Sequence, residues 1–280
     1  MFTKVLIANR GEIAVRIIRA CHELGIQTVA VYSEADREAL HTQLATQAIC
    51  IGPAKASDSY LNMTSILSAA VVTGAQAIHP GFGFLSENSA FATMCEEMNI
   101  RFIGPSSTII DLMGNKANAR RTMIAAGVPV TPGSEGYISS YEEAVVQAEK
   151  IGYPVILKAA AGGGGKGMRK VYQENGLEAA FSQAKAEAKA AFGDDSMYLE
   201  KIITPARHIE VQILGDSFGN VVHLGERDCS LQRNHQKVLE ESPSTFICEE
   251  TRKAMGDVAI RAAKHVGYTN AGTIEFLVDS

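Results

Sequence analysis

The first hundred residues alternate between short apolar runs and segments whose apolar residues recur at helical spacing. Five runs predict strands, namely Lys4–Ala8, Thr28–Tyr32, Gln47–Cys50, Ala75–His79 and Arg101–Gly104. Between the first two runs, Ile13, Ile17 and Cys21 repeat with the period of a helix, and Gly25 ends it. Strands that alternate with helices are joined by crossover connections, so we expect a mostly parallel sheet covered on both faces. The predicted fold class is α/β, and this domain is Rossmann-like.

A Rossmann-like domain invites comparison with dinucleotide-binding proteins. Glu34 and Asp36 follow the second predicted strand, where an acid that binds ribose would stand. The first turn, however, reads ANRGEIA and holds Gly11 as its only glycine. It therefore lacks the glycines that let a backbone approach a pyrophosphate closely. The sequence argues against NAD binding, which leaves an oxidoreductase as a weak alternative.

A second notable stretch is VILKAAAGGGGKGMRKVY, residues 155–172. Its glycines formally satisfy G-x-G-x-x-G and the first part of a P-loop. Met168 and Arg169 stand where a P-loop needs Lys and Ser or Thr, and the residues that follow have no helical period. A strand, a glycine loop and a second strand instead predict a flap that can close over a polyphosphate. The simpler interpretation is a mobile hairpin tip.

Prolines, glycines and serines cluster between Gly127 and Ser140, as they do in linkers, so we place a boundary there. Ser140 and Glu143 form a capping box for a helix that ends at Gly152. The later segment HIEVQIL alternates cleanly, with Ile209 on one face and His208 and Gln212 on the other, which predicts a half-buried strand. The stretch RDCSLQRNHQK, residues 227–237, is predicted to be a polar loop.

Charge and cysteine usage exclude several classes of protein. The net charge of −5 and the pI of about 5.8 give no broad basic surface, so we expect no nucleic-acid partner. The five cysteines are odd in number and far apart and form no C-x-x-C, which argues against a zinc site or a disulfide framework. The apolar run at the N-terminus is too short for a signal sequence or a membrane span. We expect a soluble, cytoplasmic protein without a membrane partner.

The chain resembles the biotin carboxylases, members of the ATP-grasp superfamily, along its whole length. The matching blocks are IANRGEIAVRIIRA, HPGFGFLSEN, MGNK, YPVILKAAAGGGGKGMR, EK, RHIEVQ, ERDCSLQRNHQKVLEESP and GTIEF. The resemblance implies a Rossmann-like (pre-ATP-grasp) N-terminal domain at 1–113 and a linker with a helix at 114–133. It further implies an ATP-grasp lid at 134–203 and a partial ATP-grasp C-terminal domain at 204–280.

The resemblance also implies a reaction. ATP phosphorylates bicarbonate to carboxyphosphate, and the CO2 passes to biotin on biotin carboxyl carrier protein, the first half-reaction of acetyl-CoA carboxylase in fatty acid synthesis. A carboxyltransferase component would use the product. Alternatives are the biotin carboxylase part of pyruvate or propionyl-CoA carboxylase, or a nucleotide-binding module only. Another ATP-grasp ligase, such as carbamoyl phosphate synthetase, is disfavoured by the block at 227–237.

Several residues acquire roles from the resemblance. Those assigned to ATP are Lys116 and Lys158 (phosphates), Gly164 and Gly165 (lid loop), Glu200, Lys201, Ile202 and Ile203 (a strand that holds adenine), His208, Gln232 and His235. Lys237 is assigned to bicarbonate as the catalytic residue, and Glu275 to ATP and to Mg2+ or Mn2+. Taken singly, each has a plainer interpretation: a solvated lysine, a core strand, a polar loop or an edge glutamate.

Two of these assignments also make physical sense. A cation such as Lys237 suits a site where bicarbonate attacks a phosphoryl group and negative charge accumulates. Glu275 lies among Ile274, Phe276 and Leu277, and a carboxylate on such an apolar strand needs a partner. Magnesium, which takes hard oxygen ligands, would be one.

The chain stops a few residues after Glu275, before the family's second metal-binding glutamate, an asparagine, and the arginine and glutamate that handle bicarbonate. We expect an N-terminal fragment that keeps much of the nucleotide pocket but cannot complete carboxylation. Arg19 and Glu23, on the first predicted helix, resemble dimer contacts of the family, which implies a homodimer of the full-length form.

Overall fold

The computed structural model describes residues 2–134, 136–160, 167–233 and 236–279, with Lys116 and Ala117 described by their backbone alone. It divides into two compact units: residues 1–111 with 268–270, and residues 112–267 with 271–280. The sequence-based boundaries at 113, 133 and 203 stay a prediction. No helix in the described part of the chain is both long enough and apolar enough to cross a bilayer.

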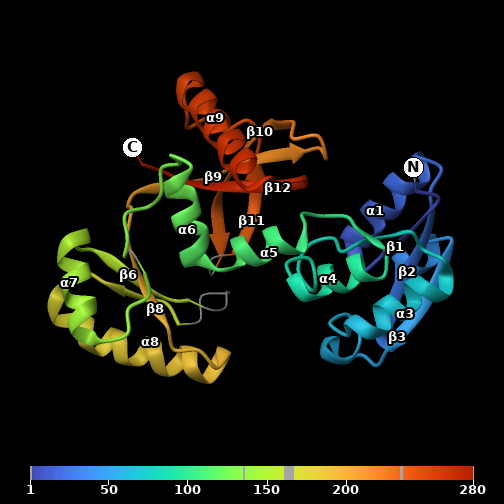
Figure 1. Ribbon diagram of the computed structural model, residues 1–280, viewed down its shortest axis with the longest axis horizontal. Helices are drawn as coiled ribbons and strands as arrows, with labels where there is room; N and C mark the ends of the chain where they lie inside the picture. The colour runs from blue at the N-terminus through green and yellow to red at the C-terminus, as the bar shows by residue number, and fades with distance from the viewer. Residues whose placement is uncertain (1, 135, 161–166, 234–235, 280) are drawn as a thin grey trace. The chain divides into compact units, whose positions relative to one another are not determined.

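The first unit is built on a parallel sheet with the order β3-β2-β1-β4-β5 (Figure 1). Its described strands are β1 (Lys4–Ile7), β2 (Gln27–Ser33), β3 (Gln47–Gly52), β4 (Ala77–His79) and β5 (Arg101–Phe102). Every neighbouring pair among them is parallel, which confirms the predicted wound α/β domain.

Helices cover both faces of this sheet, because its strands carry apolar side chains on both sides. The helices are α1 (Gly11–Glu23), α2 (Leu40–Leu44), α3 (Met63–Thr73) and α4 (Ser89–Glu97), with short 3-10 turns η1 (Glu34–Asp36) and η2 (Ala56–Asp58). On one face, Ile17 and Ile18 of α1 pack with Val5 and Ile7 of β1. On the other face, residues of α3 and α4 form a second core with the alternate strand positions.

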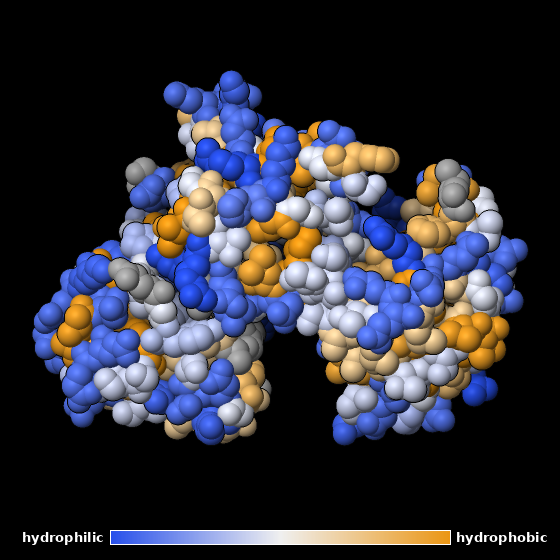
Figure 2. All heavy atoms as spheres, viewed as in Figure 1, coloured by the Kyte–Doolittle hydropathy of each residue, from blue (hydrophilic) through white to orange (hydrophobic). Residues whose placement is uncertain are grey.

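The second unit begins with α5 (Ser107–Gly114), shared across the boundary, and α6 (Lys116–Ala125), and contains a three-stranded antiparallel sheet ordered β7-β6-β8. Its strands are β6 (Val155–Ala159), β7 (Arg169–Val171) and β8 (Met197–Lys201); α7 (Tyr141–Ile151), η3 (Glu174–Gly176) and α8 (Leu177–Phe192) accompany them. We call residues 131–203 with this sheet the lid segment. Side chains of α7 and α8 bury one face of the sheet, and the outer sides of these helices are mostly hydrophilic in Figure 2.

The antiparallel pairing of β6 and β7 confirms the predicted strand–loop–strand arrangement around the glycines. Gly167 lies at the base of the loop with φ +66°, and a Cβ there would come within 2.9 Å of the Cβ of Ala159. The N-cap of α7 is Ser140, whose side chain accepts from the Glu143 N–H as predicted. The Glu143 carboxylate, however, accepts from the backbone N–H of Ser139 at 3.0 Å.

A four-stranded sheet ordered β11-β10-β9-β12 completes the second unit. Its strands are β9 (Ala206–Gly215), β10 (Val221–Arg233), β11 (Gln236–Glu241) and β12 (Asn270–Asp279), and α9 (Glu249–Val266) packs on β9 and β10. Ile213 and its cross-strand partner His223 face α9, where the His223 ring lies against Gly256. The buried Glu226 accepts from Arg252 of α9 at 2.8 Å, which fastens the helix to β10.

The prediction of a polar loop at 227–237 was wrong for most of that stretch. β10 continues to Arg233 and pairs with β11, so Gln232 lies opposite Lys237. The misleading signal was polarity. Polar side chains can line a strand face when charges on neighbouring strands compensate one another, and they do so here.

Candidate functional site

A cluster of paired charges lies on the face of the four-stranded sheet opposite α9. Lys237 of β11 donates from Nζ to Oε1 of Glu275 on β12 at 2.6 Å, and also to Oε2 of Glu210 on β9. Arg227 of β10 donates from Nε to Oε1 of Glu210 at 2.6 Å. The Glu210 side chain is only 5% exposed, so a buried carboxylate is compensated by two cations.

These contacts fix the charges of the cluster. Burial by itself would raise the pKa of Glu210, but the bonds from Lys237 and Arg227 outweigh it and hold that pKa below its usual value. Burial by itself would lower the pKa of Lys237, but the bonds to Glu210 and Glu275 raise it. Lys237 is therefore a firmly charged ammonium group at neutral pH. Glu275 is 67% exposed, so its carboxylate can bind a group that arrives from the solvent.

Arg227 extends the cluster in two further directions. Its Nε lies 3.2 Å from Oε2 of Glu240, and its Nη1 donates to Oε1 of Gln212 at 3.1 Å. Gln212 in turn donates from Nε2 to the carbonyl oxygen of Gly272 at 2.8 Å. The guanidinium of Arg227 therefore links β9, β10 and, through Gln212, β12.

Glu210, Cys229 and Glu240 are close enough together to hold a metal ion by distance alone. Their chemistry does not favour one. Arg227 and Lys237 already supply positive charge to Glu210, and Arg227 also pairs with Glu240. Burial raises the pKa of the Cys229 thiol to about 11, so the sulfur stays protonated and is a poor ligand.

The lid segment carries a second ion pair, between Lys158 of β6 and Glu200 of β8. Both side chains project from the sheet face opposite the apolar core, where Lys158 also lies over the ring of its cross-strand partner Tyr198. The structure thus brings together two residues that the sequence assigned separately, one to phosphates and one to the adenine strand.

The predicted adenine strand is shorter than expected. β8 ends at Lys201, and Ile202 and Ile203 follow it as irregular backbone. The Ile202 N–H still donates in register to Pro154 O at 3.0 Å, but Pro154 has no N–H to donate in return, so the ladder stops there. The Lys201 N–H donates to Pro132 O at 2.7 Å, and its ammonium donates to Gly152 O and to Tyr153 O.

Residues 131–134 run beside β8 like an additional strand. Gly133 lies opposite Glu200, and Ser134 donates its N–H to Leu199 O at 2.9 Å. A Cβ at Gly133 would approach Leu199 O to 2.6 Å, so this close backbone contact requires a glycine. The pairing places the chain that enters the lid segment directly against the candidate adenine strand.

The remaining predicted residues are more scattered. His208 shares the strand face of Glu210 by alternation and is exposed, and its backbone N–H donates to Oγ of Ser230 at 3.0 Å. Gln232 is half-buried and donates to Cys229 O at 3.0 Å. Lys116 begins α6, but its side chain lies outside the described residues. Gly164, Gly165 and His235 also lie outside them.

Asp36, considered above as a ribose-binding acid, serves a structural role. Its Oδ2 accepts from Tyr60 Oη at 2.7 Å, Ser33 Oγ at 2.8 Å and Arg10 Nη1 at 3.3 Å. Burial alone would raise the pKa of Asp36, but these donors outweigh it and lower that pKa. Arg10 also lies over the stacked rings of Tyr60 and Phe84. The Asp36 carboxylate is therefore already bonded to groups of its own unit.

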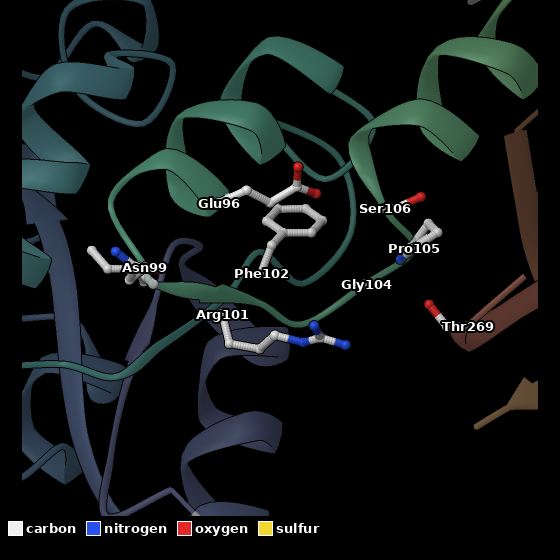
Figure 3. Close-up of a pocket in the computed structure, with 9 residues that line it drawn as sticks. Glu96, Asn99, Arg101, Phe102, Gly104, Pro105, Ser106 and Thr269 are labelled. Atoms are coloured by element: carbon white, nitrogen blue, oxygen red, sulfur yellow. The ribbon is translucent and has the colours of Figure 1, made fainter. Parts of the chain in front are cut away.

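A cavity of about 490 Å³ lies in the first unit beside the edge strand β5 (Figure 3). Phe102, Arg101 and Thr269 contribute to its lining. Its carboxylate, Glu96, accepts from the N–H and the hydroxyl of Ser107 at the start of α5. This carboxylate caps a helix, and no predicted site residue lines the cavity, so we do not place the chemistry there.

The sequence missed Glu210, Arg227 and Gln212 as members of the site. A signal was present, because the clean alternation in HIEVQIL puts Glu210 and Gln212 on the polar face of their strand. Nothing local indicated that Glu210 would be buried, since its two cations come from β10 and β11.

Comparisons with known proteins match both halves of the chain. Residues 1–110 match the family model described as biotin carboxylase, N-terminal domain, and residues 115–280 match the one described as carbamoyl-phosphate synthase L chain, ATP binding domain. Biotin carboxylase 1 of Bacillus subtilis is 60% identical over 279 residues, which cover all of this chain and 62% of that protein. The chloroplastic biotin carboxylase of Arabidopsis thaliana is 56% identical over 99% of this chain and 51% of its own length.

Solved structures agree. A biotin carboxylase–βγ-ATP complex from Campylobacter jejuni is 55% identical with a TM-score of 0.97, covering all of this chain and 63% of that one. A second structure is the biotin carboxylase domain dimer of Hydrogenobacter thermophilus 2-oxoglutarate carboxylase, in complex with MgADP, ADP and bicarbonate. It is 52% identical with a TM-score of 0.95, and the match covers 100% of this chain and 61% of that one. The chain therefore spans less than two thirds of the length of these relatives.

Proposed function

The chain belongs to the biotin carboxylase family, and we propose that it forms the nucleotide-binding portion of an ATP-dependent biotin carboxylase, a carbon–nitrogen ligase. The observation that carries the proposal is the Lys237 ammonium held between Glu210 and Glu275 on the open face of an ATP-binding fold. In the complete protein, ATP would phosphorylate bicarbonate to carboxyphosphate, and CO2 would pass to biotin on a biotin carboxyl carrier protein.

Lys237 is the residue that we assign to bicarbonate. Its charge is secured by two carboxylates, and one of them, Glu275, is exposed and can give up its contact. An anion arriving there meets a cation that is already oriented, so the attacking oxygen can be held as negative charge develops. Glu210 stays in place because it is buried and also bound by Arg227.

Glu275 fits a magnesium or manganese ion. Its carboxylate is exposed and offers hard oxygens, and magnesium usually takes only one or two protein carboxylates beside water and phosphate oxygens. A bound ion would neutralise charge on the ATP phosphates. Support comes from the Hydrogenobacter relative, which is described with MgADP and bicarbonate.

The nucleotide would lie against the lid segment. We assign Lys158 to its phosphates, which requires exchange of the Glu200 contact for a phosphate contact. Glu200, Lys201, Ile202 and Ile203 would hold adenine, with His208 and Gln232 contacting the nucleotide. Lys116, Gly164, Gly165 and His235 complete the proposed set. The ammonium of Lys201 is tied to the end of α7, so its contribution to adenine would be a backbone one.

The acyl acceptor and the assembly are also proposals. We favour acetyl-CoA carboxylase, with a carboxyltransferase component as partner, because several curated relatives are named simply biotin carboxylase. The biotin carboxylase subunit of a pyruvate carboxylase is 54% identical, so that enzyme is the second candidate. Arg19 and Glu23 lie exposed and four residues apart on α1, which suits the proposed homodimer contact. A cytoplasmic location is part of the proposal.

The test separates ATP binding from turnover. A fluorescent ATP analogue should bind this chain in the presence of magnesium, and NADH should not bind. Bicarbonate-dependent ATP hydrolysis should appear only in a chain extended to the full length of the relatives. Equal bicarbonate-dependent rates in the two chains would show that residues 1–280 are already complete, and absence of turnover in both would support a nucleotide-binding module only.

A further inference from the structure

Gln212 lies between two strands that the proposed chemistry needs to keep together. Its Oε1 accepts from Arg227 of β10 at 3.1 Å, and its Nε2 donates to the carbonyl oxygen of Gly272 on β12 at 2.8 Å. The side chain is half-buried, and Gln212 has so far been given no role in ligand binding or catalysis.

The orientation of this amide is fixed by its neighbours. A guanidinium group only donates hydrogen bonds, so the oxygen of the amide must face Arg227. A backbone carbonyl only accepts, so the nitrogen must face Gly272. Neither a carboxylate nor an ammonium side chain could bond to both neighbours. A carboxylate has no donor for Gly272 O, and an ammonium group has no acceptor for Arg227.

Gly272 lies three residues before Glu275. Among the described residues, β12 has a strand neighbour on one side only, β9, and its side chains alternate regularly between half-buried and exposed. A strand at the edge of a sheet is held by fewer backbone bonds than a central one. A side-chain tie to its backbone therefore adds to the forces that set the position of Glu275.

We propose that Gln212 is a positioning residue that holds β12 so that Glu275 stays beside Lys237 and within reach of the divalent ion it would bind; this rests on the proposed function. Arg227 is the pivot. Because it also binds the buried Glu210, one guanidinium fixes both Glu210, which orients Lys237, and Gln212, which orients the strand of Glu275.

The substitution Gln212→Glu separates the two contacts. It keeps the length of the side chain and the acceptor for Arg227, but it replaces the donor that faces Gly272 with an oxygen. A matched control is Gln183→Glu, which adds the same charge at an exposed position on α8. Gln212→Ala, which removes both contacts without adding charge, serves as the second variant if the first fails to fold.

The first readout is hydrogen exchange of the β12 backbone amides in the 280-residue chain. We expect residues 271–279 to exchange about threefold to tenfold faster in Gln212→Glu and Gln212→Ala, the range for loss of one neutral hydrogen bond, and to be unchanged in Gln183→Glu. Unchanged exchange in both Gln212 variants would overturn the proposal.

The second readout is the gain in affinity for a non-hydrolysable ATP analogue on addition of magnesium. Gln212→Glu should reduce this gain severalfold while the affinity without magnesium stays within about twofold, and it should have no further effect in a Glu275→Gln background, because coupled residues are non-additive. An unreduced gain, or an equal effect in both backgrounds, would contradict a positioning role. If the unaltered chain shows no gain with magnesium, the proposed function fails, and hydrogen exchange still decides whether Gln212 holds β12.

Discussion

Lys158 and Glu200 form an ion pair between the adjacent strands β6 and β8, two residues out of register, on the sheet face opposite the apolar core. Glu200 thus already pairs with Lys158, the cation that we assign to the ATP phosphates. The two ligands compete, so the carboxylate sets how strongly Lys158 attracts phosphate.

We therefore expect Glu200→Gln to strengthen binding of tripolyphosphate or an ATP analogue by roughly two- to fivefold, the scale of a partly exposed ion pair. Lys158→Gln should weaken it. The difference should shrink with added salt. Glu187→Gln, which breaks the Arg169–Glu187 pair elsewhere in the lid segment, is the control and should leave affinity unchanged. Weaker binding by Glu200→Gln would show that the carboxylate positions Lys158 and does not compete for it.

The close approach of residues 131–134 to β8 predicts a strong difference between two neighbouring glycines. Gly133→Ala would force a Cβ against Leu199 O and Glu200, which should lower the free energy of unfolding by about 1–3 kcal/mol and weaken nucleotide binding. Gly136→Ala has open space around the added carbon and should be close to neutral. Urea denaturation of both variants measures the difference. Similar stabilities would mean that the segment does not pack against β8 as described.

The pKa of Lys237 should depend on the two carboxylates that contact it. Removing negative charge with Glu210→Gln or Glu275→Gln should lower the pKa of Lys237, because both carboxylates raise it. The deprotonated amine then becomes more available at alkaline pH. Mass spectrometry after amine labelling at pH 9 should show severalfold faster modification of Lys237, with Lys253 of α9 as the reference in the same sample. A constant Lys237 rate would contradict the ion-pair cluster.

The first unit should lose stability in mild acid. His41 is 1% exposed, its Nε2 lies 3.2 Å from Val31 O, and its Nδ1 has no hydrogen-bond partner in the described structure. Burial is the main effect on its pKa and lowers it; the charge of Asp36 opposes this change and that of Arg10 adds to it. As the pH falls below about 6.5, the unfolded state binds a proton that the folded state resists, so the free energy of unfolding decreases.

His41→Gln should flatten this dependence between pH 7.5 and 5.5. Denaturation curves followed by a probe in the first unit measure it, and an equally steep decrease in the variant would assign the effect to another group.

The architecture of the first unit was predictable because its signals are local. Each strand is a continuous apolar run and each helix has a regular apolar period. The burial of residues such as Ile17 and Val5 can therefore be predicted without knowledge of the fold. The lid hairpin was predictable for the same reason, since strand-like residues follow the glycines.

The polar strand segments 227–233 and 236–241 were not predictable in this way. Arg227, Gln232 and Lys237 look solvated in sequence, and only cross-strand pairing with residues such as Glu210 makes a strand of them favourable. Glu210 itself was missed because a carboxylate becomes a buried site residue only when two cations from other strands reach it.

Lys201 is the residue at which the two ends of the lid segment meet. Its backbone N–H binds the incoming chain at Pro132, and it is also the last residue of the outgoing strand. Segments whose two ends lie side by side can be removed or exchanged with little disturbance of the surrounding chain. The segment between Thr131 and Ile202 is thus suited to transplantation: the corresponding segment of a relative could be joined at these two residues, and only a short bridge would be needed to delete it.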